Sequence, residues 1–197
     1  DPMIRVGRVK KALVIGAEKL SPFMNLTDRT SCILFGDAAG AACLGPAPDD
    51  SASDLVASRF GTAFDDESLT IPAGGSKMPA THETVEKHLH TVPMNGRAIY
   101  RFAVNTLTNE LRGVCEDAGV PLSNVKCFIP HQVNIRIIDS AMENLDVPME
   151  KVFINLDKYG NTSAASVPVA LDEAHRAGWF SRGDYVAICA FGAGKSW

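Results

Sequence analysis

The sequence lacks long hydrophobic runs, paired cysteines and a strong excess of either charge. No apolar run in the chain approaches the roughly 20 residues that a membrane-spanning helix needs. The formal net charge of -4 gives no general basis for binding nucleic acid or an anionic membrane. The 5 cysteines form no CxxC pair and no metal-like spacing. Each has apolar neighbours, so we expect buried, reduced thiols in a cytoplasmic protein.

The start of the chain lacks both a methionine and a convincing leader. The sequence opens on Asp1 and Pro2, which is typical of a processed piece or a fragment. Basic residues precede an apolar run at 12–17, but this run is too short for a signal peptide and leads into Glu18 and Lys19. With 46% hydrophobic residues, the chain can bury a sizeable core as one domain or two small ones.

Apolar runs and helical periodicity give the order of elements. Strands are predicted at 12–17, 31–35, 41–44, 55–60, 69–71, 125–129, 152–156 and 184–190. Helices are predicted at 95–118, 135–145 and about 163–177. The alternation in the second half favours an α/β layered fold with a largely parallel sheet. A Pro-, Asp- and Ser-rich loop at 46–53 is the best internal boundary, and small residues at 36–42 allow another backbone or a ligand to come close.

The most informative stretch contains a buried strand that ends at Pro130 and is followed at once by His131. Asn134 stands where it can cap a helix that begins at Ile135. A nearby helix N-terminus disfavours a protonated imidazole, and a neutral histidine can donate a hydrogen bond to a carbonyl or a developing oxyanion. A histidine that merely satisfies a turn is the more frequent case, so His131 alone predicts no function.

A second polar residue, Asn161, follows the strand predicted at 152–156. Gly160 permits a turn with positive φ before it, and a helix N-cap is the simplest role for Asn161. If the strands before His131 and Asn161 are neighbours in a parallel sheet, both side chains emerge at the edge where α/β proteins usually bind ligands. The pair therefore predicts a site that neither residue predicts by itself.

Other polar residues are weaker candidates. His82, His88 and His90 lie among charged residues with no reason to converge, which favours a solvated loop or helix over a metal site. Arg97 and Arg101 are four positions apart and share one face of the helix predicted at 95–118. That face is either solvated or in contact with an anion.

Several stretches of sequence carry a family resemblance. They are residues 27–41, 72–76, 129–136, 159–168 and 191–194. Together, in order and approximate spacing, they resemble the β-ketoacyl-acyl-carrier-protein synthase III family of the thiolase-like superfamily. The resemblance implies a layered α-β-α-β-α fold of two similar halves. Residues 1–46 would end the first half, 47–94 would form linking strands and loops, and 95–197 would form most of the second half.

The activity implied by the resemblance is a decarboxylative Claisen condensation that initiates fatty acid biosynthesis. A cysteine thiolate takes an acyl group from acyl-coenzyme A, and the enolate of decarboxylated malonyl-acyl carrier protein attacks it. The family's His and Asn match His131 and Asn161, which implies that both donate hydrogen bonds to the malonyl thioester oxygen. Neutral donors in a dry pocket favour an enolate, and losing one such donor typically costs about 3 kcal/mol.

The resemblance also implies binding roles for further residues. The family's other oxyanion site uses a backbone amide that falls at Ala193, where an alanine is tolerable if its φ is negative. The positions that line the pantetheine channel of coenzyme A match Gly96, Tyr100 and Asn134. The surface that docks the acidic carrier protein matches Gln132, Arg136, Arg101 and Arg97.

The family's nucleophilic cysteine has no counterpart in this sequence. In the family it lies on a helix that precedes the strand matching 12–17. Cys43 also follows two alanines, but it continues an extended segment where the family places a core aliphatic residue, and no helix start follows. The chain therefore resembles the C-terminal two-thirds of the enzyme, with the cysteine on a missing segment or on a second chain.

The implied partners are acyl-coenzyme A and malonyl-acyl carrier protein, with a cytoplasmic homodimer and no metal or other cofactor. One alternative is a non-catalytic module of the same fold that binds acyl thioesters or carrier protein. Another is a secondary-metabolism acyltransferase with an oxygen or nitrogen nucleophile, although such an acceptor needs a base rather than the pair His131 and Asn161. A metal-dependent hydrolase is the remaining rival.

Overall fold

The computed structural model describes residues 2–29, 31–47, 54–65, 68–93 and 96–197. Its helices are α1 (Pro2–Arg5), α2 (His82–Glu86), α3 (Gly96–Asp117), α4 (Ile135–Leu145), α5 (Leu156–Tyr159) and α6 (Ser166–Arg176). Its strands are β1 (Ala12–Glu18), β2 (Ala38–Leu44), β3 (Val125–Pro130) and β4 (Tyr185–Cys189). None of the helices in the described ranges combines the length and hydrophobicity of a membrane span.

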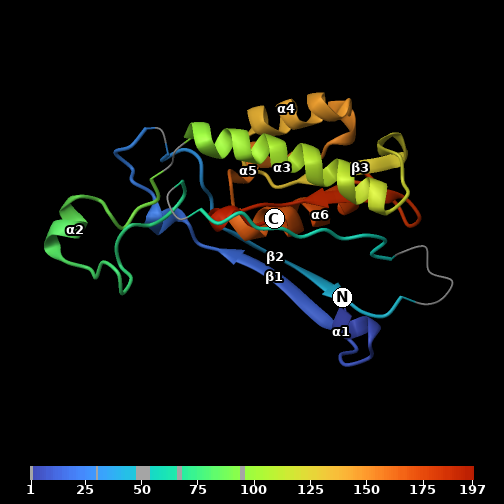
Figure 1. Ribbon diagram of the computed structural model, residues 1–197, viewed down its shortest axis with the longest axis horizontal. Coiled ribbons are helices and arrows are strands. Elements are labelled where there is room, and N and C mark those ends of the chain that lie inside the picture. Colours follow the sequence, from blue (N-terminus) through green and yellow to red (C-terminus); the bar gives the residue numbers. More distant parts are fainter. Residues whose placement is uncertain (1, 30, 48–53, 66–67, 94–95) are drawn as a thin grey trace.

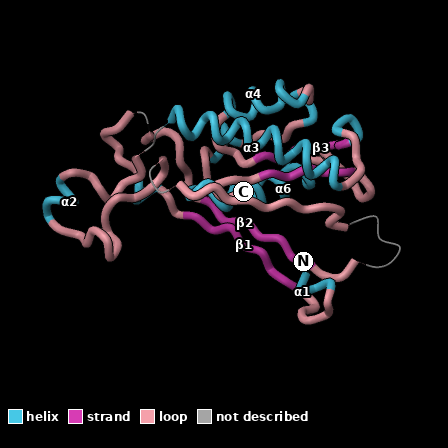
Figure 2. Tube along the Cα trace, viewed as in Figure 1, coloured by secondary structure: helices cyan, strands magenta, loops and turns pink. Residues whose placement is uncertain are grey.

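These elements stack in alternating layers of helix and strand (Figures 1 and 2). The helices α3 and α4 pack together on one side, and α3 also contacts β4. The strand pair β3–β4 lies beneath them, and α6 contacts β3 as well as β1 and β2. The β1–β2 pair forms the outermost layer, on the far side of α6 (Figure 1). The order of layers agrees with the predicted α/β layered fold.

The parallel sheet predicted for the second half is present in β3 and β4. Their register places Pro130 opposite Cys189. On β3, Phe128 also forms a single parallel bridge with Val152. The strand predicted at 152–156 is therefore wrong, since only this bridge forms before α5 begins.

A buried side chain explains why that ladder stops. Gln132 is 1% exposed, and its Nε2 donates to the carbonyls of Pro130 and Phe153 at 2.9 and 3.2 Å. Its Oε1 accepts from the N–H of Asn155 at 3.1 Å. The side-chain amide thus occupies backbone groups that a continuing ladder would use. Because both ends of this amide are engaged and buried, it is not available to a docking partner, contrary to the role expected for Gln132.

The small residues of β2 permit the close approach that the sequence predicts. The β1–β2 pair is antiparallel, with Gly16 opposite Gly40. A Cβ on Gly16 would lie 2.1 Å from the carbonyl oxygen of Ala164, and one on Gly40 would lie 3.0 Å from Pro168. The space beside these two glycines is therefore filled by the residues around the start of α6. This packing brings the turn after Asn161 against the β1–β2 pair.

Three further strands predicted from apolar runs do not form. Residues 31–34 make turns, 55–60 make no ladder, and 69–71 contain only an isolated bridge position. In the second segment, Arg59 instead pairs with Glu110 and Asp117 of α3, each at 3.0 Å. Apolar runs predict strands only where a partner strand is present. The loop predicted at 46–53 lies, from 48 onward, outside the described residues, as does residue 95, the predicted start of the long helix.

The main hydrophobic core lies between α3, α4 and the β3–β4 pair. Its fully buried side chains include Leu107, Leu111, Phe128 and Ile138. The predicted apolar stripe of the long helix supplies much of this core. The helix ends at Asp117, one residue before its predicted end at 118, and Gly119 follows with a φ of 65°.

The core predicts a large stability effect at Leu107. Because Leu107 is 0% exposed, Leu107→Ala in the complete protein should lower the free energy of unfolding by about 2–5 kcal/mol, through lost burial and a residual cavity. Chemical denaturation measures this change. The control is Asn109→Ala, an exposed site on the same helix, which should stay within about 0.5 kcal/mol of the parent. Equal effects at both sites would contradict the placement of this core.

Candidate functional site

His131 and Asn161 line the same pocket. The cavity has a volume of about 60 Å³ and lies between β3, the Asn161 turn and the C-terminal segment. Its wall is largely apolar, with Phe35, Ile99, Phe102, Leu69, Val133 and Phe191 among the lining residues. The two polar side chains that the sequence singles out therefore face one small, mostly apolar space.

Strand β3 positions His131 directly beyond its last residue. The backbone N–H of His131 donates to the carbonyl of Cys189 at 2.8 Å, which extends the parallel ladder by one bond. The ring meets the edge of Phe191 with the centroids 5.3 Å apart. Its Nδ1 lies 2.6 Å from Ser166 Oγ, and Nε2 has no hydrogen-bond partner among the described residues.

The imidazole of His131 is neutral near pH 7. Burial lowers its pKa from 6.5 to about 4, because a charged ring would lose its hydration in the apolar pocket. The sequence predicts a neutral ring from the nearby N-terminus of α4, and the neutral state agrees, but burial is the cause. A neutral ring carries one N–H and can donate one hydrogen bond.

Asn161 is fixed by bonds on three sides. Its backbone N–H donates to Leu34 at 2.8 Å, and its carbonyl accepts from Gly36 at 2.9 Å. Its Oδ1 accepts from the N–H of Ser163 at 2.9 Å. The carboxamide oxygen thus closes a local turn two residues long, but the predicted N-cap role is wrong, because Thr162 is the N-cap of the 3-10 turn that follows and Ala165 is the N-cap of α6. Its Nδ2 has no partner in the described part of the chain and remains as a donor.

The turn before Asn161 requires a glycine. Gly160 has a φ of 66°, and a Cβ there would lie 3.0 Å from the carbonyl oxygen of Leu34. The backbone at residue 160 therefore reverses while staying close to the neighbouring segment. This geometry sets the side chain of Asn161 at the pocket wall, as the sequence predicts for a positive-φ turn.

The C-terminal turn supplies backbone groups to the same pocket. Ala193, Gly194 and Lys195 all line it. Gly194 and Lys195 have positive φ values of 74° and 51°, whereas Ala193 is not among the positive-φ residues. The condition set for an alanine at this position is met. Ala193 also stands at the first position of a 3-10 turn, where a backbone N–H has no partner within the turn.

A partly buried ion pair at the pocket escapes prediction from sequence. Lys195 Nζ pairs with a carboxylate oxygen of Asp65, and Asp65 also accepts from the N–H and hydroxyl of Ser68 at 2.8 and 2.7 Å. The ammonium lies 5.8 Å from the ring centre of Phe102. Asp65 and Lys195 are far apart in the chain, and neither has a local signal that would pair them.

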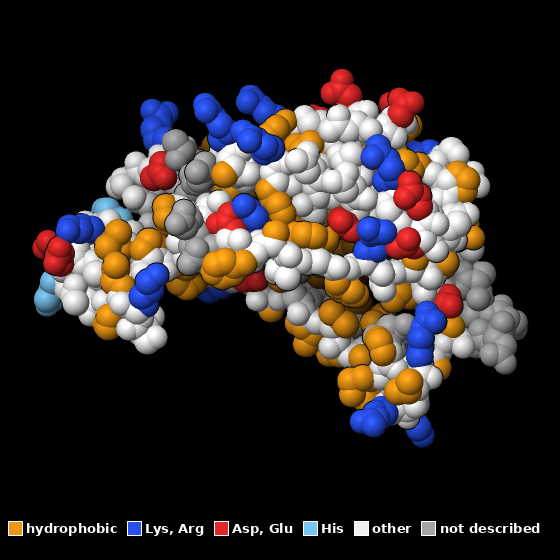
Figure 3. All heavy atoms as spheres, in the orientation of Figure 1, with side chains coloured by type: hydrophobic (Ala, Val, Ile, Leu, Met, Phe, Trp, Pro, Cys, Tyr) orange, Lys and Arg blue, Asp and Glu red, His pale blue; other side chains and the backbone are white. Residues whose placement is uncertain are grey.

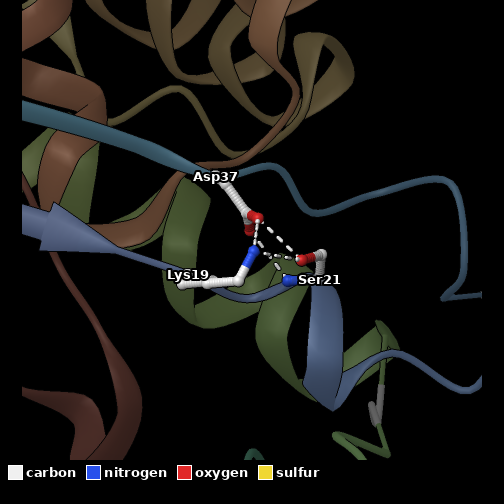
Figure 4. A network of polar contacts seen from close by, with 3 residues as sticks. All are labelled: Lys19, Ser21 and Asp37. Atoms are coloured by element: carbon white, nitrogen blue, oxygen red, sulfur yellow. Dashed lines mark hydrogen bonds and ion pairs between the residues drawn. The ribbon is translucent and has the colours of Figure 1, made fainter.

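A hydrogen-bond network holds the residue that follows Phe35 and Gly36, the two neighbours of Asn161 on this segment (Figure 4). Asp37 accepts from the N–H and the hydroxyl of Ser21 at 2.8 and 2.6 Å, and pairs with Lys19 at 3.1 Å. These bonds tie the end of β1 to the residues just after Phe35, which lines the pocket. The hydrogen bonds from Ser21 lead the interactions that lower the pKa of Asp37 from 3.8 to about 2.

The lowered pKa of Asp37 predicts an acid-dependent contribution to stability. The carboxylate binds fewer protons in the folded than in the unfolded chain, so its contribution is present above pH 3.8 and disappears as the pH falls through about 2. We expect the stability difference between the complete protein and its Asp37→Asn variant to shrink over this range. Thermal unfolding at a series of pH values measures it. A difference independent of pH would contradict the network.

The residues expected along the coenzyme A channel lie at the N-terminal ends of α3 and α4. Gly96 begins α3, and Asn134 caps α4 by accepting from the N–H of Arg136 at 2.9 Å. Tyr100 reaches between the helices, and its hydroxyl lies 2.7 Å from Ser140 Oγ. None of the three expected channel residues lines the described pocket itself.

The three arginines expected at a docking surface are exposed and lie in the same region. Arg97 and Arg101 lie on the first turns of α3, and Arg136 lies on the first turn of α4. The hydroxyl of Tyr100 on α3 donates to the carbonyl of Arg136 at 3.5 Å, which brings these turns together. Figure 3 shows Lys and Arg side chains gathered over the N-terminal part of α3. No acidic side chain of the described residues pairs with these three guanidinium groups.

Three of the five cysteines are buried as predicted, and two are not. Cys115, Cys127 and Cys189 are buried, and burial raises the pKa of Cys127 to about 11 and that of Cys189 to about 12. Cys32 is half-buried and Cys43 is exposed on β2, so the expectation of five buried thiols is wrong for these two. No cysteine lies in the described wall of the pocket.

The histidines at 82–90 lie on and after α2, at one end of the molecule (Figure 1). His90 Nε2 lies 2.9 Å from Thr84 Oγ1. Within the described ranges, no three His, Cys, Asp or Glu side chains are arranged to hold a metal ion.

Family models match both parts of the chain. Residues 1–63 match the model described as 3-oxoacyl-[acyl-carrier-protein (ACP)] synthase III. Residues 115–197 match the model described as the C terminal of the same synthase. His131, Asn161 and Ala193 all fall within the second match.

Curated relatives and solved structures cover nearly all of the chain. Beta-ketoacyl-[acyl-carrier-protein] synthase III of Caldanaerobacter subterraneus subsp. tengcongensis is 47% identical over 195 residues, which is 98% of this chain and 58% of that protein. The synthase III of Clostridioides difficile is 44% identical over 98% of this chain and 58% of its own length. The crystal structure of the Aquifex aeolicus VF5 synthase III aligns with a TM-score of 0.86 and 41% identity, covering 100% of this chain and 59% of that one. The chain thus spans somewhat more than half the length of these relatives.

Proposed function

The chain belongs to the 3-oxoacyl-[acyl-carrier-protein] synthase III family, and on this premise we propose that it is the C-terminal part of a β-ketoacyl-acyl-carrier-protein synthase III. It has part of the layered, thiolase-like α/β fold of that family's solved structures. The reaction would be the decarboxylative Claisen condensation of acyl-coenzyme A with malonyl-acyl carrier protein. Residues 1–46 would close the first half of the fold, 47–94 would link the halves, and 95–197 would form most of the second half.

The observation that carries this proposal is the pair of unpartnered donors in one pocket. His131 Nε2 and Asn161 Nδ2 both lack partners among the described residues, and both residues line the same cavity. In the proposed reaction, the malonyl thioester oxygen accepts a hydrogen bond from each. As the carboxylate leaves as carbon dioxide, negative charge moves onto this oxygen, and the two donors stabilise the enolate.

The acyl-enzyme half of the reaction needs a nucleophile from elsewhere. The described pocket wall holds no cysteine, and the relatives are longer than this chain. We propose that the acylated cysteine comes from a segment outside these 197 residues or from a second chain. The N–H of Ala193 would donate to the oxyanion that forms when the enolate attacks the acyl thioester.

The substrates would approach along the N-terminal ends of α3 and α4. Gly96, Tyr100 and Asn134 would line the channel for the pantetheine arm of coenzyme A. The exposed arginines would dock the acidic carrier protein, and their lack of acidic partners in the described region supports this role. Gln132 would hold the strand ends behind His131 rather than touch the carrier.

We propose a cytoplasmic homodimer that needs no metal or other cofactor for this chemistry. Two neutral hydrogen-bond donors can supply the stabilisation of enolate charge, so the step requires no Lewis acid. The five cysteines are free, which suits a reducing compartment.

The complete protein tests the function directly. Incubated with acyl-coenzyme A and malonyl-acyl carrier protein, it should release carbon dioxide and form β-ketoacyl-acyl carrier protein, which mass spectrometry detects. Tight binding of both thioesters without turnover would instead identify a non-catalytic binding module. Acyl transfer to an alcohol or amine without release of carbon dioxide would identify the secondary-metabolism alternative.

If the exposed arginines dock the carrier protein, reversing one of their charges should weaken the reaction with malonyl-acyl carrier protein alone. Arg136→Glu in the complete enzyme should raise KM for malonyl-acyl carrier protein by about tenfold, because a rim charge chiefly alters association with the acidic partner. The kinetics with malonyl-coenzyme A should change little. Lys126→Glu, an exposed charge reversal on β3, is the matched control. Equal losses with both malonyl thioesters would rule out a carrier-specific surface.

A further inference from the structure

Ser166 contacts His131 from the side of the imidazole ring that faces away from the pocket. It is the first residue of α6, is 2% exposed, and does not line the pocket. Its Oγ lies 2.6 Å from Nδ1 of His131, and His131 is itself 6% exposed. Two buried polar groups from separate layers of the fold therefore meet in a short hydrogen bond.

We propose that Ser166 is a positioning residue that holds His131 as the tautomer with its hydrogen on Nε2. The inference rests on the proposed function, because it assigns the origin of the hydrogen that the malonyl oxygen would receive. Ser166 itself would touch neither substrate nor the reacting atoms. It would act only through the imidazole.

The direction of the hydrogen bond follows from counting hydrogens. A neutral imidazole carries one N–H, and a serine hydroxyl carries one O–H. If Nδ1 of His131 held the hydrogen, Ser166 Oγ would accept it and its own O–H would need a second acceptor. Among the described residues, His131 is the one hydrogen-bond partner of this hydroxyl. Because buried polar groups are hydrogen-bonded, the O–H donates to Nδ1 and the hydrogen of the ring is on Nε2.

The usual role of a serine near a helix start does not account for Ser166. The N-cap of α6 is Ala165, and no side-chain cap hydrogen bond is present there. The hydroxyl of Ser166 is therefore not used to satisfy the free N–H groups of the helix. Its contact in the described structure is the ring of His131, 35 positions earlier in the chain.

The choice of tautomer decides what the pocket offers a ligand. With the hydrogen on Nε2, the ring donates into the cavity, alongside Nδ2 of Asn161. With the hydrogen on Nδ1, the ring would present a lone pair to the thioester oxygen, and the growing negative charge would be repelled. Each pocket donor is then oriented by a hydrogen bond to the other polar atom of its side chain: the N–H of Ser163 bonds to Oδ1 of Asn161, and the hydroxyl of Ser166 bonds to Nδ1 of His131.

The test reads the tautomer and the chemistry separately in the complete protein. Imidazole ¹⁵N chemical shifts at pH 7, with His131→Gln identifying the signal, should show the hydrogen on Nε2 in the parent. Ser166→Ala should give a mixture of tautomers and lower kcat for malonyl decarboxylation by roughly ten- to hundredfold, with KM and acylation little changed. Ser166→Thr, which keeps the hydroxyl, should restore most of both properties. Ser123→Ala, at an exposed serine, is the control for the serine-to-alanine change.

The outcomes distinguish the proposed role of Ser166 from the proposed synthase function. A hydrogen on Nδ1 in the parent overturns the role of Ser166, whether or not the alanine variant folds. An alanine variant that keeps both the Nε2 tautomer and full decarboxylation does so too. If the parent shows a Ser166-dependent Nε2–H but no decarboxylation, the proposed function fails while the assignment of the tautomer stands.

Discussion

Replacing His131 by alanine in the complete enzyme is expected to reduce malonyl decarboxylation by about 10²–10³-fold. The ring supplies one of the two donors in the pocket, and its loss leaves the enolate oxygen with a single hydrogen bond. Acylation by acyl-coenzyme A should survive, because the proposed thiolate attack uses no hydrogen bond from this ring. Release of labelled carbon dioxide measures the first step, and the mass of the intact acyl-enzyme measures the second.

The pH dependence of the parent separates a hydrogen-bond donor from an acid or base. Since burial holds the pKa of His131 near 4, the ring stays neutral from pH 5 to 8 and decarboxylation should not follow its titration there. His175→Ala, an exposed histidine on α6, is the matched control and should retain activity. Normal decarboxylation in His131→Ala would end the assignment of this residue. A loss of acylation equal to the loss of decarboxylation would instead indicate a general disruption of the site.

The parts of the site that could be predicted from sequence are those set by local rules. The helix at Ile135–Leu145 begins and ends where predicted, because Asn134 provides a cap and the apolar stripe is regular. Gly160 marks the positive-φ turn that positions Asn161. The juxtaposition of His131 with Asn161 follows once both are placed at strand ends on one edge of a layered fold, although Asn161 follows a single bridge partner and not a full strand.

The parts that could not be predicted depend on side-chain contacts between residues that are far apart in the sequence. The amide of Gln132 takes the place of ladder bonds beyond Val152, so an apolar run that reads as a strand does not become one. The contact between Ser166 and His131, and the ion pair between Asp65 and Lys195, join residues with no local signal. Such pairs become visible only when the layers are stacked.

The two roles of Asn161 can be separated by a substitution that preserves one of them. The side chains of Asn and Asp can both accept from a backbone N–H two residues on, so Asn161→Asp keeps an oxygen to accept from the N–H of Ser163. It replaces the Nδ2 donor by a carboxylate oxygen, which places negative charge where the enolate would form. If this turn hydrogen bond were the whole role of Asn161, the aspartate variant would be active.

We therefore expect Asn161→Asp in the complete enzyme to keep the hydrogen bond from Ser163 but to lose malonyl decarboxylation by at least the 10²–10³-fold expected for a missing donor. A carboxylate at this largely apolar wall loses its hydration, so the variant should also be less stable than the parent at pH 7. Asn161→Ala should show a similar loss of decarboxylation together with a lower stability of about 1 kcal/mol, because it removes the hydrogen bond from the N–H of Ser163 as well. Thermal unfolding and release of labelled carbon dioxide measure the two effects independently. Near-normal decarboxylation in both variants would refute the donor role, since neither alanine nor an ionised carboxylate has a hydrogen to give to the thioester oxygen.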